Sequence, residues 1–66
     1  MELIILKSDE DYIRVKDATY LCVAMDKASV FPMDQLAMVE THAGALEKQG
    51  YPKVAIKKLV ISEEPL

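Results

Sequence analysis

The chain has 66 residues, a formal net charge of −3, a pI of about 4.9 and one cysteine, Cys22. This length allows one domain, residues 1–66, and a lone cysteine excludes an intramolecular disulfide. The acidic balance argues against nucleic-acid binding, which needs a basic face. The apolar runs are too short for a membrane span or a secretory signal, so we expect a cytoplasmic protein with no membrane partner.

The first two predicted strands are residues 2–6 and 11–16. The first is the β-prone run "ELIIL", which the polar "KSDED" ends. The second, "DYIRVK", alternates between apolar and polar side chains, which is typical of a half-buried strand. Ile13 and Val15 share one side of it, and the other side carries Tyr12, Arg14 and Lys16.

A third strand is predicted over residues 20–26, "YLCVAMD". Leu21, Val23 and Met25 share one face there, and the other face carries Tyr20, Cys22 and Ala24. The short segment around Asp17-Ala18 would join the second and third strands as a hairpin, although it is a weaker turn sequence than Asp-Gly.

The apolar spacing predicts a helix from Pro32 to Gln49. Its core stripe recurs at three and four residues and consists of Leu36, Val39, Ala43 and Leu46. Pro32 suits the first helical position, which makes Phe31 the N-cap, and Gly50 is placed to end the helix.

The entry to this helix allows two interpretations. Free backbone N–H groups, with Ser29 and Lys27, could form an anion site. Alternatively, Asp34 supplies the negative charge that a helix N-terminus favours, and the stretch only begins a helix. We favour the second interpretation because no glycine-rich loop is present.

The last strand is predicted over residues 53–62, and residues 62–66 form a short acidic tail. Val54 and Ile56 lie in phase, whereas Leu59 and Ile61 lie out of phase with them. Either a bulge resets the register near Lys57-Lys58, or the two halves of the strand face different layers.

These elements predict an α+β fold of two layers in the order β-β-β-α-β. The sheet would be mostly antiparallel with one helix packed on one face. With three strands and a helix before it, the last strand would run parallel to the first strand through a right-handed crossover. The other sheet face would be left to water or a partner.

Catalytic chemistry finds little support in the sequence. Cys22 lies within an apolar run and is best explained as a small buried hydrophobe, and a nucleophile would need a base nearby. His42, the only histidine, has no acid at a useful helical spacing, so we expect a residue at the boundary of the core. No second histidine or cysteine stands at metal-ligand spacing. We therefore predict no catalytic residue, cofactor or metal.

The basic residues concentrate near the last strand, at Lys48, Lys53, Lys57 and Lys58. They could bind an acidic partner or a phosphate backbone. The favoured explanation is that they protect a strand from edge-to-edge pairing or simply solvate it.

An interface is the strongest functional expectation. Met38 and Ala45 put soft and small side chains on the outer side of the predicted helix, where charge would be usual. Tyr12 and Tyr20 would add to the interface from the outer sheet face, because tyrosine is enriched at interfaces. Short chains have thin cores, which self-association can complete.

The sequence thus favours a small, non-catalytic interaction or regulatory protein that is a homo-oligomer and binds a further, unidentified protein. In size and character the chain resembles many small bacterial or phage accessory proteins. The alternative is a small-molecule binding module, with a pocket between sheet and helix or at a subunit interface. Its lining would come from Tyr12, Tyr20, Phe31 and Tyr51.

Overall fold

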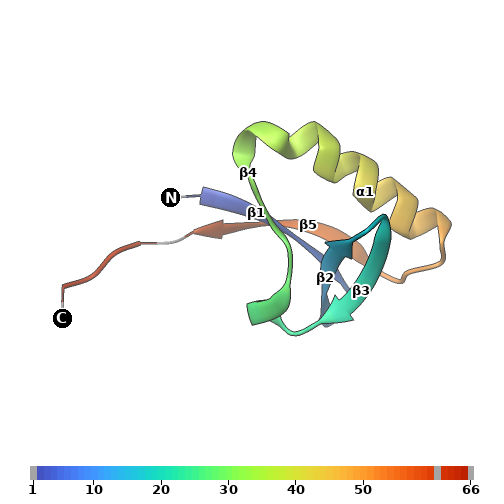
Figure 1. Ribbon diagram of the computed structural model, residues 1–66, viewed down its shortest axis with the longest axis horizontal. Coiled ribbons are helices and arrows are strands. Elements are labelled where there is room, and N and C mark those ends of the chain that lie inside the picture. Colours follow the sequence, from blue (N-terminus) through green and yellow to red (C-terminus); the bar gives the residue numbers. More distant parts are fainter. Residues whose placement is uncertain (1, 61, 66) are drawn as a thin grey trace.

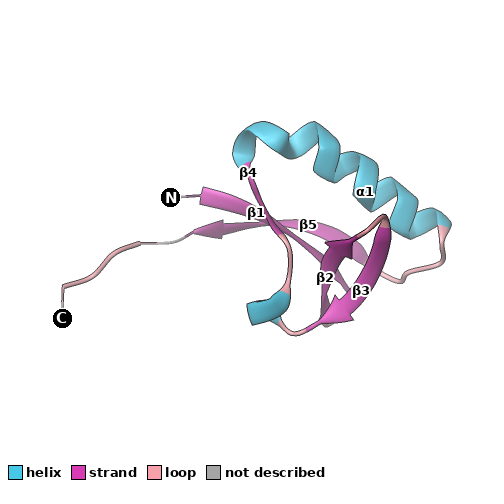
Figure 2. Ribbon diagram, in the orientation of Figure 1, coloured by secondary structure: helices cyan, strands magenta, loops and turns pink. Residues whose placement is uncertain are grey.

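The computed structural model describes residues 2–60 and 62–65, and in it five antiparallel strands form a sheet with one helix across one face (Figures 1 and 2). The two-layer α+β prediction is confirmed. The strands are β1 (Glu2–Ser8), β2 (Asp11–Lys16), β3 (Thr19–Val23), β4 (Val30–Pro32) and β5 (Val54–Val60). The helical segments are two 3₁₀ turns, η1 (Met25–Lys27) and η2 (Met33–Gln35), and the helix α1 (Leu36–Lys48).

Strand β1 is the centre of the sheet. β5 pairs with it along its whole length, from Glu2 opposite Val60 to Ser8 opposite Val54. The other edge of β1 is therefore shared: β4 pairs with residues 3–5 and β2 with residues 7–8. β3 pairs only with β2, so β3 and β5 each leave one edge without a strand partner among the described residues.

The short strand β4 was not predicted, and it changes the direction of the last strand. Pro32 ends β4 instead of opening the helix, and the 3₁₀ turn that follows has Pro32 as its N-cap. A residue before proline is disfavoured in the helical region, which keeps Phe31 extended. Because β4 adds one reversal of the chain, β5 runs antiparallel to β1, and the expected parallel pairing is wrong.

No bulge interrupts β5 between Val54 and Val60. Its register against β1 is continuous over all seven residues, so the two halves of β5 face different layers. Val54 and Ile56 lie on the helix side, whereas Leu59 lies opposite Leu3 on the other face. Ile61, the other out-of-phase residue, lies outside the described part of the chain.

The core lies between the sheet and α1. Its buried members are Ile4, Leu6, Ile13, Val39, Ala43 and Leu46. Leu36 was predicted to belong to this stripe, but it lies at the start of the helix and is 39% exposed. The helix ends as predicted: Gly50 has φ +92°, and the N–H of Tyr51 donates to the carbonyl of Leu46 at 3.1 Å.

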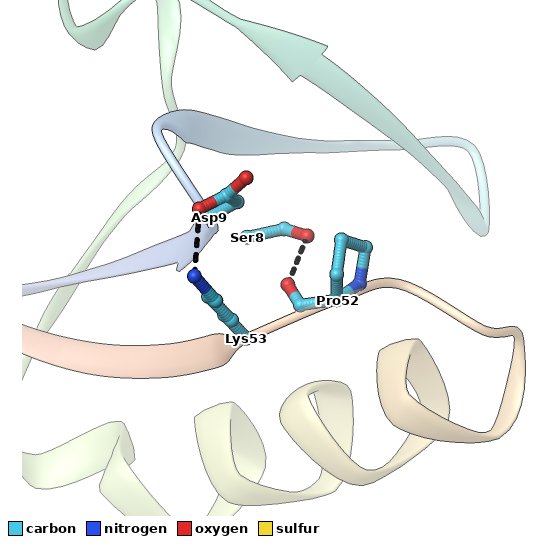
Figure 3. Close-up of polar contacts among 4 residues, drawn as sticks. All are labelled: Ser8, Asp9, Pro52 and Lys53. Carbon is cyan, nitrogen blue, oxygen red and sulfur yellow. Dashed lines mark hydrogen bonds and ion pairs between the residues drawn. The ribbon is translucent and has the colours of Figure 1, made fainter.

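Two polar contacts fix the connection from α1 to β5 against the turn between β1 and β2 (Figure 3). The hydroxyl of Ser8, which is buried, donates to the carbonyl of Pro52 at 2.7 Å. The ammonium of Lys53 lies 3.9 Å from a carboxylate oxygen of Asp9, and both side chains are exposed. The Lys53–Asp9 pair adds little stability because water screens it.

Candidate interaction surface

Several large apolar side chains are exposed in this small chain. Among the described residues, seven are exposed by 39% to 66%: Leu21, Met25, Val30, Met33, Leu36, Met38 and Val60. The buried hydrophobic residues also number seven. Single exposed apolar residues are ordinary, so the position of these seven side chains on the fold decides whether they form a patch.

No α-helix of the described residues covers the sheet face away from α1, but the 3₁₀ turn η1 lies on that side (Figure 2), and Ile5 on this face is 3% exposed. Alternation along the paired strands places Leu3, Ile5 and Lys7 of β1 on this outer face, because Ile4 and Leu6 face the core. Cross-strand register then adds neighbours from the other strands: Tyr12, Arg14, Lys16, Leu21, Val23, Val30, Lys57 and Leu59.

Tyr12 lies on this outer face, as predicted. The ammonium of Lys7, directly opposite in the register, lies 4.8 Å from the centre of the Tyr12 ring. A cation over an aromatic face is an attractive arrangement. Both side chains are half-buried, so the pair forms a fixed, amphipathic part of the outer face.

Tyr20 is on the opposite face, and the expectation that it joins Tyr12 on the outer face is wrong. It lies opposite Val15 in the β2–β3 hairpin and packs against the core. Its hydroxyl is 2.8 Å from Nδ1 of His42, and the two rings meet edge to face with centroids 5.6 Å apart. Phe31 lies on another side of the imidazole, at 6.1 Å.

His42 is therefore a half-buried residue at the boundary of the core, as expected, and it joins α1 to β3 and β4. Cys22 was expected to be buried but is exposed, because β3 is an edge strand. Neither a hydrogen bond nor an ion pair joins Cys22 to His42 in the described part of the chain.

On the helix, Met38 is 42% exposed, as the interface prediction requires. Ala45 is half-buried, so it lies on a flank of α1 and not on its outermost side. The outermost positions carry small side chains, all exposed: Ala37, Thr41 and Gly44. A Cβ at Gly44 would meet nothing within 4 Å, so this stretch of the helix surface is open.

The entry to α1 does not offer the side chains of an anion site. The hydroxyl oxygen of Ser29 accepts a hydrogen bond from the N–H of Val15 at 2.9 Å. The N–H of Ser29 donates to the carbonyl of Ile13 at 3.1 Å, so Ser29 continues the ladder beside β2 where the pairing of β2 with β1 has ended. Asp34 lies in the first helical turn, but no side chain caps that turn. The structure agrees with the favoured interpretation, in which this stretch begins a helix.

The basic residues near β5 do not form one patch. Lys57 and Lys58 point to opposite faces, and Lys58 pairs with Glu2 at 2.9 Å. This ammonium lowers the pKa of the Glu2 carboxyl below its ordinary value, mainly through the hydrogen bond and then through the opposite charge. Lys57 instead joins Lys7 and Arg14 on the outer face, a grouping that needed the register of β5 to be found.

Within residues 2–60 and 62–65, no three potential metal-binding side chains come together, and no pocket opens between sheet and helix. No helix in these residues is long and apolar enough to cross a membrane. No protein-family model, curated protein or solved structure matches this chain.

Proposed function

We propose that this protein is a non-catalytic interaction or regulatory protein that assembles with copies of itself and, in that form, binds another protein. The observation that carries this proposal is the set of seven large apolar side chains exposed among the described residues, as many as the buried hydrophobic residues there. Exposed apolar area of this kind marks interaction sites in soluble proteins. Tyr12 and Met38 remain the predicted interface residues that are best placed for such contacts.

The proposed compartment is the cytoplasm. Cys22 is a free, exposed thiol, and such a thiol suits a reducing environment better than an oxidising one. Small-molecule binding stays an alternative only at an interface between subunits, because the described residues contain no pocket.

Light scattering behind a sizing column, over a concentration series, tests the proposal. We expect a mass well above the 7.4 kDa of one chain, rising with concentration. A mass of one chain throughout the series would contradict self-association. Co-purification of a metabolite with the assembled protein, or a thermal shift with one, would instead favour the ligand-binding alternative.

A further inference from the structure

The outer face of the sheet is basic although the protein as a whole is acidic. Four of the eight lysines and arginines lie on it: Lys7, Arg14, Lys16 and Lys57. The strands contribute no acidic residue to this face, because Glu2 and Asp11 both fall on the helix side by alternation. Such a face attracts an acidic surface.

The exposed side of α1 has the opposite charge. Glu40 and Glu47 are seven residues apart, so they lie two turns apart along one side of the helix. Both are exposed, and Lys48 is the only lysine or arginine in α1. Beside them run the small side chains of Ala37, Thr41 and Gly44, which let another surface approach the helix closely.

We propose that copies of this protein stack head to tail, with the exposed side of α1 in one copy docked on the outer sheet face of the next. This inference rests on the proposed self-association and names its contact surfaces. Glu40 and Glu47 face the basic residues of the neighbouring sheet. The same contact covers Leu21 and Val30 on the sheet and reaches Leu36 on the flank of the helix, three of the exposed apolar residues.

Charge selects this arrangement over a symmetric dimer. In a two-fold dimer each surface meets its own copy, which brings Lys57 and Arg14 against a second basic face, or Glu40 and Glu47 against a second acidic helix. Like charges facing each other oppose association. A head-to-tail contact satisfies both surfaces, and its repetition gives a ring or an open stack.

Two charge-reversal variants test the arrangement. The sheet variant is Arg14→Glu/Lys57→Glu, and the helix variant is Glu40→Lys/Glu47→Lys. All four positions are exposed, and none makes an ion pair within the described residues, so the fold should survive, which circular dichroism verifies. In each variant alone the two substituted positions face residues of their own charge on the next copy, although Lys7 and Lys16 stay on the sheet face of the sheet variant. A mixture of the two variants offers complementary surfaces.

Light scattering of each variant and of the equimolar mixture gives the decisive comparison. We expect the association constant of either variant alone to fall by about tenfold or more, because two attractive pairs become repulsive. The mixture should return to the mass of the unmodified protein, and added salt should weaken its association. If either variant alone assembles like the unmodified protein, or if the mixture gains no mass, head-to-tail stacking is wrong. Those outcomes leave self-association standing, whereas an unmodified protein that stays monomeric removes both.

Discussion

The side chain of Ser8 and the backbone carbonyl of Pro52, 44 residues apart in the chain, are joined by a hydrogen bond of 2.7 Å (Figure 3). Ser8 is 3% exposed and is the buried polar residue of the described core. The bond holds the connection after α1 against the end of β1, at the point where β5 begins its pairing.

Replacing this hydroxyl should therefore weaken the fold. For Ser8→Ala we expect the free energy of unfolding to fall by about 1–2 kcal/mol, because the carbonyl of Pro52 loses its donor in a partly buried bond. Urea unfolding followed by circular dichroism measures the change. Ser62→Ala, in the exposed tail, is the control and should leave the midpoint unchanged. Equal midpoints for both variants would show that water replaces the Ser8 hydroxyl at no cost.

A glycine in the turn between β2 and β3 should increase the stability of the protein. Asp17 and Ala18 both have positive φ, at 48° and 63°. Residues with a Cβ adopt such angles only at an energetic cost. We expect Ala18→Gly to raise the free energy of unfolding by roughly 0.5–1 kcal/mol. Glycine relieves the backbone strain in the folded protein, and the greater freedom of glycine in the unfolded chain offsets part of that gain.

The reverse exchange at another left-handed position is the matched control. Gly50, with φ +92°, ends α1, and Gly50→Ala should lower stability by about 1–2 kcal/mol. Thermal unfolding of both variants measures the pair of effects. A loss of stability in Ala18→Gly would show that the hairpin depends on the Ala18 side chain more than on its backbone angle.

Removing the hydroxyl from each of the two tyrosines of the predicted interface should change the free energy of unfolding by different amounts. Tyr20→Phe removes the contact with Nδ1 of His42, and we expect a loss of about 1 kcal/mol because that contact is half-buried. Tyr12→Phe keeps the ring under the ammonium of Lys7 and should be nearly neutral. Denaturant midpoints at neutral pH compare them, and a neutral Tyr20→Phe would mean that the imidazole finds water instead.

The Glu2–Lys58 ion pair should make the free energy of unfolding depend on pH in the acidic range. Because the pKa of the Glu2 carboxyl is lower in the folded protein than its ordinary value of 4.5, this group favours folding above that value. The contribution disappears as the pH falls through the folded pKa, where the carboxylate takes up a proton.

A carboxyl titration by NMR checks the direction of this shift. Lys58→Gln should return the pKa of Glu2 toward 4.5, since Lys58 is its main cause. Lys57→Gln, on the next residue but the opposite face, is the control and should leave the Glu2 titration unchanged. The same titration curve in all three proteins would show that the ion pair is absent in solution.

The sequence allowed the layers to be predicted, but not the direction of every strand. Alternation over residues 11–16 and the helical spacing after residue 36 are strong periodic signals, and both elements formed. β4 has only three residues, too few to show a period, and Pro32 is as suitable for the end of a strand as for the start of a helix. Missing that one strand reversed the predicted direction of β5.

The candidate surface was predictable only in part. Tyr12 and Arg14 could be placed together from alternation within one strand. Their grouping with Lys7 and Lys57 depends on the registers of β1 with β2 and with β5, and the second register links residues far apart in the chain. Tyr20 was assigned to the wrong face because local alternation does not say which side of β3 meets the helix.

The pairing of β1 with β5 also decides how the chain can fold. The central strand comes first in the chain, and the partner that covers its full length comes last, with Glu2 opposite Val60. Closing a loop of almost the whole chain is entropically expensive, and contacts of this range slow folding. On the ribosome, β1 must emerge and wait until β5 has been made. During that interval its isoleucines lack their main strand partner, and unpaired apolar strands of this kind are prone to aggregation.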